Sequence, residues 1–298
     1  MTIDSAQLAT FHAVVTDGSF EAAARSLHLT PSAVSQRIKA LEQAVGQVLV
    51  QRVKPCAPTE AGRSLFRLAG QVALLETEAL EAARGPLAGG RTRTRVAIVV
   101  NADSLLTWFL PALAGLPAEP ALSFDLHCDD QDHTADILRA GTAMAAVTAQ
   151  HVAVQGCRVE PLGAMRYVAV AAPDVHAQHF AGGPADPSFV AAPMLVLNRK
   201  DRLQHRYLDM VTTGEVDPPI HYVPAASAFV EAVRLGLGWG LVPEQIARPD
   251  IAAGRCVELI PGRYVDVPLY WQYWRLESTV LSTLTEAVRA AAADTLRR

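Results

Sequence analysis

One short segment carries polar side chains whose types and spacing suit the recognition of DNA bases. Its apolar residues recur at helical spacing and would form one buried face: Val34, Ile38, Leu41 and Val45. Away from that face lie short hydroxyls, an amide and cations: Ser32, Ser35, Gln36, Arg37 and Lys39. An amide can pair with adenine, and a cation can contact guanine or phosphate. Because every amphipathic helix has a polar face, the neighbouring segments must decide between a DNA-reading surface and a merely solvated one.

Local signals make this segment the second helix of a helix-turn-helix. Ser19 is suited to cap the preceding helix. Thr30 followed by Pro31 favours the start of the next one, since the Thr hydroxyl accepts from a free N–H and Pro has no N–H to lose. A short turn between two helices lets the second one enter a major groove. We expect a helix-turn-helix over about residues 19–38, within a DNA-binding domain of residues 1–58.

The charge distribution favours the DNA-binding interpretation. The whole chain has a net charge of -4, yet residues 1–95 hold 11 Lys and Arg against 8 Asp and Glu. Between Arg25 and Arg67 the balance is 7 against 2. Because Lys and Arg replace counterions on phosphates, we expect polyanion binding in this N-terminal module and not in the acidic remainder.

A small β wing is predicted after the second helix, where Pro55 and Pro58 punctuate two short pieces. Arg52 and Lys54 lie in this region, and both could reach the DNA backbone or minor groove. For Lys54, a solvated surface position is an equally good interpretation.

A long helix is predicted over residues 59–86, beginning at Thr59 and ending at Gly85-Pro86. Its apolar residues alternate in steps of 3 and 4, which is typical of a helix that pairs with a copy of itself. The predicted dimerisation stripe includes Leu65, Leu68, Val72 and Leu75. A flexible, basic hinge is expected over residues 87–94.

Three runs resemble the N-terminal signature of the LysR-type transcriptional regulators: residues 20–27, 30–42 and 59–62. The resemblance covers essentially the whole chain. It implies a winged helix-turn-helix, a linker helix that dimerises and a C-terminal effector domain. It also implies promoter DNA as a partner, a homodimer that commonly pairs into a tetramer, and RNA polymerase as a partner if the protein activates.

Some residues depart from the usual family pattern, and others point to one branch of the family. Val50 and Pro58 replace the usual wing residues, which puts the wing contacts with DNA in doubt. Residues 55–59, 101–105 and 108–113 resemble the arginine/lysine-responsive branch. That branch implies control of genes for amino-acid export or metabolism.

Beyond residue 95, short strands alternate with helices, which predicts an α/β effector domain over residues 95–298. The order of elements recurs, so we expect two lobes resembling those of periplasmic binding proteins. The first would comprise about residues 95–165 and 270–298, and the second about 166–269. In such sheets, ligands settle at the carboxyl ends of strands, against helix N-termini.

That rule selects the candidate effector-binding residues. They are Asn101, Asp103, Ser104, Asp129, Asp130, Thr148, Ala226 and Ser227. Amide and hydroxyl donors suit the carboxylate of an amino acid, and acidic groups suit a cationic side chain. Lysine or arginine is therefore the inferred effector. Alternatively, Asp103 could only cap a helix, and part of the acidic turn must face water.

Other classes of protein lack support in the sequence. No apolar stretch is long enough to span a membrane, and four separated cysteines favour a reducing cytoplasm. We expect no metal and no cofactor. The sequence contains no GxSxG, P-loop or HExxH motif that would indicate an enzyme. The glycine-rich residues 236–240 follow a predicted helix and precede a strand, which is the reverse of the order in a dinucleotide site.

The sequence therefore predicts a cytoplasmic, DNA-binding transcription regulator that responds to lysine, arginine or both. One alternative is a DNA-binding inhibitor of replication initiation, which would need little effector response. Another is a cytoplasmic amino-acid-binding protein without a regulatory role.

Overall fold

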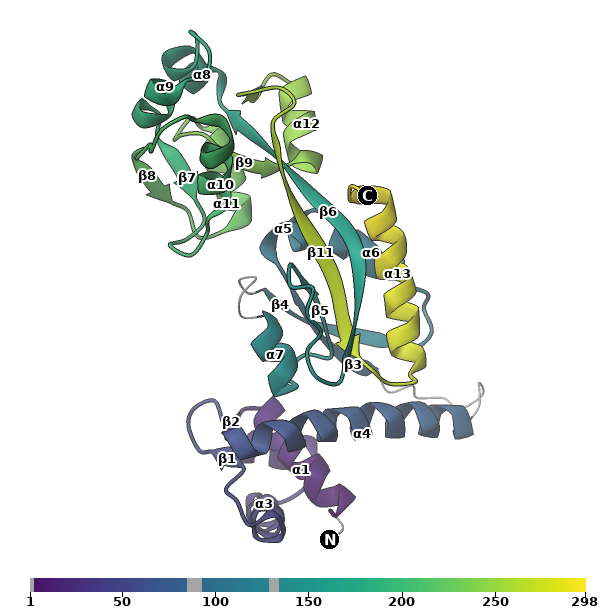
Figure 1. Ribbon diagram of the computed structural model, residues 1–298. Coiled ribbons are helices and arrows are strands. Elements are labelled where there is room, and N and C mark those ends of the chain that lie inside the picture. Colours follow the sequence, from purple (N-terminus) through teal and green to yellow (C-terminus); the bar gives the residue numbers. More distant parts are fainter. Residues whose placement is uncertain (1–2, 85–92, 129–133) are drawn as a thin grey trace. The chain divides into compact units, whose positions relative to one another are not determined.

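The computed structural model describes residues 3–84, 93–128 and 134–298 (Figure 1). They form two compact units, each assembled from separate stretches of chain. The first comprises Met1–Val100, Pro117–Val159 and Trp271–Thr285. The second comprises Asn101–Leu116, Glu160–Tyr270 and Glu286–Arg298. Most of the predicted hinge lies outside the described residues.

The first unit begins with three short helices and a wing. They are α1 (Ser5–Thr16), α2 (Phe20–Ser26), α3 (Pro31–Val45), β1 (Val50–Gln51) and β2 (Ala57–Pro58). Ser19 accepts a hydrogen bond from the N–H of Ala22, and Thr30 accepts one from the N–H of Ala33. The two predicted caps are thereby confirmed. β1 and β2 pair in antiparallel fashion, as expected of the small wing.

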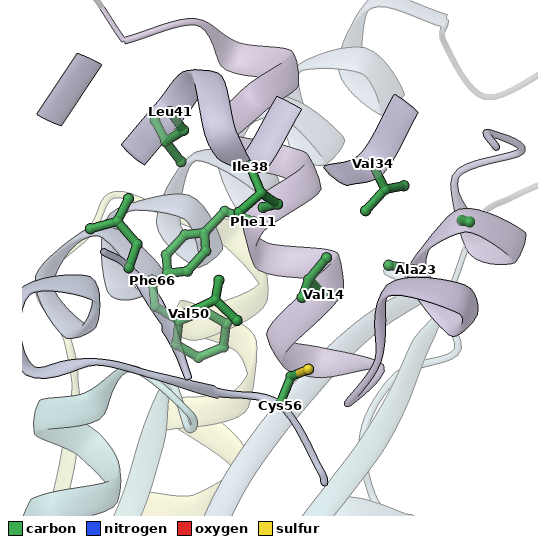
Figure 2. Close-up of a cluster of buried hydrophobic side chains, with 11 residues drawn as sticks. Phe11, Val14, Ala23, Val34, Ile38, Leu41, Val50, Cys56 and Phe66 are labelled. Carbon is green, nitrogen blue, oxygen red and sulfur yellow. The ribbon is translucent and has the colours of Figure 1, made fainter. Parts of the chain in front are cut away.

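One apolar core holds these elements together (Figure 2). Phe11 and Val14 of α1 are buried in it with Val34, the first residue of the predicted apolar face of α3. Ile38 and Leu41, the next two residues of that face, are buried in the same core. Each such side chain contributes roughly 1.5–3 kcal/mol when fully buried. Burial of this face leaves the opposite, polar face of α3 toward solvent.

The long helix α4 (Glu60–Arg84) follows the wing, as predicted. Phe66 and Leu74 are buried, whereas Leu68 and Leu75 are 41% and 39% exposed. Gly70 permits a close approach, because a Cβ atom there would lie 2.9 Å from the Trp274 ring.

The first unit also contains a parallel sheet. Its central strand β3 (Thr94–Val100) lies between β4 (Leu122–Cys128) and β5 (Ala145–Thr148), with α7 (Thr134–Ala140) connecting the outer two. Val96, Ile98 and Val99 are fully buried, as expected for a strand covered on both faces.

A carboxylate on α4 caps the start of α13 (Thr279–Thr295), and this start belongs to the same unit. The Ser278 hydroxyl donates to Glu78 Oε1 at 2.7 Å, and the N–H of Val280 donates to the same oxygen at 2.9 Å. Ser278 in turn accepts from the N–H of Leu281. Helix starts require such acceptors, because their first N–H groups have no partner within the helix.

The second unit combines antiparallel strands, a short parallel pair and several helices. β6 (Cys157–Ala171) lies beside β9 (Gly240–Pro243), β10 (Val257–Glu258) and β11 (Tyr264–Trp274), the last of which continues into the first unit. β7 (Met194–Val196) pairs in parallel with β8 (Ile220–Tyr222). The helices include α8 (Pro173–His179), α9 (Asp186–Ala191), α10 (Leu203–Val211), α11 (Ala226–Arg234) and α12 (Glu244–Ala252).

The helical region after β3 is not one regular α-helix. It begins at α5 (Ala102–Ser104), continues as a π-helical turn, η1 (Leu105–Phe109), and ends with α6 (Leu110–Ala114). π turns occur mostly as single turns within α-helices and frequently lie at functional sites.

The glycine-rich residues 236–240 connect α11 to β9, as predicted. A Cβ atom at Gly238 would lie 2.4 Å from the carbonyl oxygen of Pro193, so only glycine fits there. Among the described helices, none has the length and apolarity needed to cross a membrane.

Candidate functional site

The polar face of α3 presents the side chains that were predicted to read DNA. Ser32, Gln36 and Lys39 are exposed, and Ser35 is half-buried. Spacings of 4 and 3 residues keep the three exposed side chains on one side of the helix. In the described part of the chain, Gln36 and Lys39 make no side-chain hydrogen bond or ion pair, so both are available to a ligand. Their contact with bases or phosphates stays a prediction.

The remaining basic candidates differ in how freely they can reach DNA. Arg37 is half-buried and donates to the Thr10 hydroxyl at 3.4 Å, which connects α3 to α1. Arg52 in the wing is exposed, and its guanidinium lies 4.9 Å from the centre of the Phe20 ring. Lys54 is exposed as well. Arg37 therefore has a structural contact, whereas Lys54 remains open to both interpretations given above.

In the second unit, three polar side chains gather where the chain leaves β3. Asn101 is 4% exposed and Ser104 is 0% exposed. Neither Asn101 Oδ1 nor Ser104 Oγ has a hydrogen-bond partner within the described residues. Buried polar atoms are nearly always partnered in folded proteins, so these two atoms indicate a place for a ligand or water.

Asp103 lies between them and bonds to a residue that the sequence did not indicate. Its Oδ2 accepts from the hydroxyl of Tyr167, on β6, at 2.7 Å. Burial raises the pKa of Asp103 above its ordinary value, and the negative charge of Asp201 raises it further. The Tyr167 hydrogen bond acts in the opposite direction. Burial and the nearby Asp103 charge likewise raise the pKa of Tyr167.

Asp201 is the second residue that sequence reasoning missed. It lies just before α10 and accepts from the N–H groups of Leu197 and Leu203 at 3.2 and 2.9 Å. In the sequence it stands among Arg199, Lys200 and Arg202, so the segment reads as basic. The structure nevertheless places the Asp201 charge near enough to Asp103 to affect its pKa. Two carboxylates thus create a site that favours a cation.

The start of α11 supplies a different kind of group. Ala226 and Ser227 form its first turn, and the preceding Ala225 provides no side-chain cap. The N–H groups of this first turn consequently lack partners within the helix, and Ser227 is exposed. Such a turn can accept an anionic group such as a carboxylate.

The remaining predicted effector residues are Thr148, Asp129 and Asp130. Thr148 belongs to the first unit, where it ends β5, is buried, and accepts from the N–H of Gln150 at 3.1 Å. Asp129 and Asp130 lie outside the described residues. The effector roles of all three stay predictions. Over residues 3–84, 93–128 and 134–298, no group of three or more His, Cys, Asp or Glu side chains is placed to hold a metal ion.

The predicted dimerisation stripe on α4 is partly covered and partly open. Leu65 is half-buried against the core of the N-terminal helices, and Val72 is also half-buried. Leu68 and Leu75 are the exposed members. Two exposed leucines spaced one heptad apart suit a helix that packs on a copy of itself, and this use of α4 stays a prediction.

Comparison with known proteins identifies both halves of the chain. Family models match the bacterial regulatory helix-turn-helix protein, lysR family, over residues 5–63, and the LysR substrate binding domain over residues 89–297. The HTH-type transcriptional regulator LysG of Mycobacterium tuberculosis is 48% identical over 295 residues, which are 99% of this chain and 95% of that protein.

Two solved structures resemble the whole fold. The crystal structure of ArgP from Mycobacterium tuberculosis has a TM-score of 0.86 and 47% identity, and the match covers 99% of each chain. Full-length LysG from Corynebacterium glutamicum with bound effector Arg has a TM-score of 0.79 and 40% identity, over 99% of this chain and 100% of that one. The expected winged helix-turn-helix followed by a two-lobed α/β domain is therefore confirmed, and so is the resemblance to the arginine/lysine-responsive branch. This chain belongs to the LysR-type family of transcriptional regulators.

Proposed function

We propose that this protein is a promoter-binding regulator whose DNA binding or activation responds to lysine or arginine. The observation that carries the proposal is the environment of Asp103. Its carboxylate is held in a buried setting beside a second carboxylate, Asp201, and both conditions disfavour an uncompensated negative charge. A bound cation relieves that cost, so the site selects a ligand with a positively charged side chain.

The other groups of the second unit suit the opposite end of an amino acid. Within the described residues, Ser104 carries a buried hydroxyl without a partner, and the first turn of α11 offers unpaired N–H groups, so both can donate to a carboxylate. Asn101 Oδ1, which also lacks a partner, is an acceptor and suits the α-ammonium of the ligand. We assign the side-chain ammonium or guanidinium to Asp103 and Asp201, and the carboxylate to Ser104 and the start of α11. The bound effector Arg of the Corynebacterium glutamicum relative supports this ligand class.

We further propose that α3 reads the promoter and that α4 joins two copies of the chain. The exposed Ser32, Gln36 and Lys39 would contact bases and phosphates in the major groove, with Ser35 and Arg37 beside them. A dimer through α4 would present two such helices to two half-sites, and a dimer of dimers would extend the site. RNA polymerase becomes a partner if the protein activates. The protein would act as a regulator, not as an enzyme, in the cytoplasm.

Fluorescence anisotropy tests the proposal directly. The full-length protein is titrated onto the DNA upstream of its own gene at one fixed salt concentration, with lysine, arginine or leucine present in parallel. We expect lysine or arginine, and not leucine, to shift the DNA affinity or the stoichiometry of the complex. Isothermal titration calorimetry of each amino acid without DNA measures effector binding separately.

Three other outcomes would contradict parts of the proposal. Tight DNA binding with no heat of binding from any amino acid would exclude lysine and arginine as effectors. It would favour the replication-inhibitor alternative. Amino-acid binding without specific DNA binding would favour a binding protein without a regulatory role. Equal responses to leucine and lysine would show that the carboxylates do not select the ligand.

A further inference from the structure

The first unit contains a cavity of about 310 Å³, and its lining includes none of the proposed effector contacts. Its walls come from α1, α4, β3, β4, the turn after α7 and the end of β11, all within that unit. Cavities of this size lie at the lower end of the range for small-molecule sites. A ligand in this cavity would therefore contact both the N-terminal helices and the sheet of the first unit.

The walls are mainly apolar and partly aromatic. His12 of α1 stacks on Phe66 of α4, with ring centres 5.1 Å apart and planes inclined by 17°. Gly70 leaves room for the Trp274 ring beside α4. Burial lowers the pKa of His12, and the charge of Arg95 lowers it further, so this ring is neutral near pH 7. Flat, uncharged rings of this kind suit an aromatic ligand.

Within the described residues, three residues of the lining carry a buried polar atom without a hydrogen-bond partner, namely Trp274, Thr94 and His127. Trp274 is 1% exposed and Thr94 is 7% exposed, yet neither Trp274 Nε1 nor Thr94 Oγ1 has a hydrogen-bond partner within the described residues. An indole N–H can only donate, so Trp274 requires an acceptor. The lining residues thus include an indole donor without its acceptor and a hydroxyl that can donate as well.

The charged groups of the lining favour an anion as that acceptor. Arg93 and Arg95 carry positive charge, and Asp125 carries the opposing one. Arg95 donates to Asp125 at 2.5 Å, and His127 Nε2 lies 3.4 Å from the same carboxylate oxygen. Asp125 is therefore already engaged, which leaves an excess of positive charge for a ligand.

We propose that this cavity binds a small aromatic carboxylate, as a site separate from that of the amino-acid effector. The aromatic ring packs among Phe66, Leu74 and Trp274. The carboxylate accepts from Trp274 Nε1–H and the Thr94 hydroxyl, and it faces the positive charge of Arg93 and Arg95. Because its walls come from α1 and α4 as well as from β3 and β4, the ligand stabilises the packing of these elements.

Calorimetry and thermal denaturation of the full-length protein test this site with indole-3-acetate as the probe. Indole-3-acetamide, which has the same ring but no charge, is the matched neutral probe. We expect indole-3-acetate to bind and to raise the Tm, and we expect the amide to bind about tenfold more weakly. The Asp103→Asn variant should bind indole-3-acetate normally, which separates this site from the proposed effector site.

Two variants locate the probe. Thr94→Val keeps the side-chain shape and removes the hydroxyl, and Trp274→Phe keeps an aromatic ring and removes the N–H. Each should weaken indole-3-acetate about tenfold and reduce its preference over the amide, whereas Thr283→Val, on α13 and outside the lining, should leave both unchanged. Absence of binding, equal binding of the two probes, or unchanged affinity in both cavity variants would overturn the proposal.

Discussion

Replacing Asp103 with Asn should separate effector binding from folding stability. Asn keeps the shape of the side chain and an oxygen that can accept from the Tyr167 hydroxyl, so the 2.7 Å hydrogen bond can persist. The substitution removes the charge that we assign to the cationic end of the effector. It also removes a charge whose ionisation the folded protein disfavours.

The size of the binding effect follows from the contact that is lost. A hydrogen bond that involves a charged group contributes about 1.5–3 kcal/mol, and about 1.4 kcal/mol corresponds to a tenfold change in affinity. Lysine or arginine should therefore bind about 10- to 100-fold more weakly to Asp103→Asn. Specific DNA binding without effector should stay unchanged, because α3 is untouched.

Stability should change in the opposite direction. The pKa of Asp103 is raised above its ordinary value of 3.8, so the folded state binds a proton more readily than the unfolded state. The contribution of this group to stability is largest below that value and is lost as the pH rises through the raised pKa. Wherever this group is ionised in the folded state, the wild-type protein carries the cost of a buried charge that the variant does not carry. The variant without effector should therefore have an equal or higher Tm.

Calorimetry with lysine and arginine and thermal denaturation without them measure the two effects. Asp209→Asn is the matched control, since Asp209 is exposed on α10 of the same unit. Unchanged affinity in Asp103→Asn would refute the assignment of the cationic end. A simultaneous loss of affinity and of Tm would show that Asp103 supports the fold instead.

Three further substitutions address other parts of the protein. Gln36→Ala should weaken specific promoter sites by about 1–3 kcal/mol and leave non-specific binding nearly unchanged, as measured by anisotropy; equal losses on both would make Gln36 structural. Because the pKa of His12 is lowered from 6.5, its contribution to stability is present above that value and is lost as the pH falls below it. His12→Phe should therefore lose less Tm than the wild type between pH 7.5 and 5.5, and an identical loss would contradict the pKa shift. Leu68→Glu should place a charge in the proposed dimer seam and yield monomers by size-exclusion chromatography with light scattering, whereas unchanged dimers would exclude this face.

The local features of the N-terminal module could be predicted because their causes lie within a few residues. The caps at Ser19 and Thr30 depend on N–H groups three positions further along, and the apolar face of α3 depends on its helical period. The exposed Leu68 and Leu75 follow from the same kind of spacing on α4. For these elements, the position of each cap and of each apolar face follows from the local sequence.

The site around Asp103, Tyr167 and Asp201 could be predicted only in part, because its contacts join distant segments. Asp103 and Tyr167 are separated by 64 positions, and no periodicity connects a helix start to a side chain in the middle of a long strand. Asp201 is concealed in the sequence by its basic neighbours, and its position depends on the turn before α10. The π-helical turn over Leu105–Phe109 also has no signal in the apolar spacing.

The cap that Glu78 provides for α13 has a consequence for how this protein can be divided. An effector domain produced alone, beginning after α4, would lack that carboxylate, and the N–H of Val280 would lose its acceptor. Loss of a helix cap typically costs about 0.5–2 kcal/mol. Measurements of effector affinity on such a fragment would refer to a domain with a weakened terminal helix. In related proteins the same contact should constrain substitutions. Where Glu78 is replaced, we expect another capping residue near the position of Ser278.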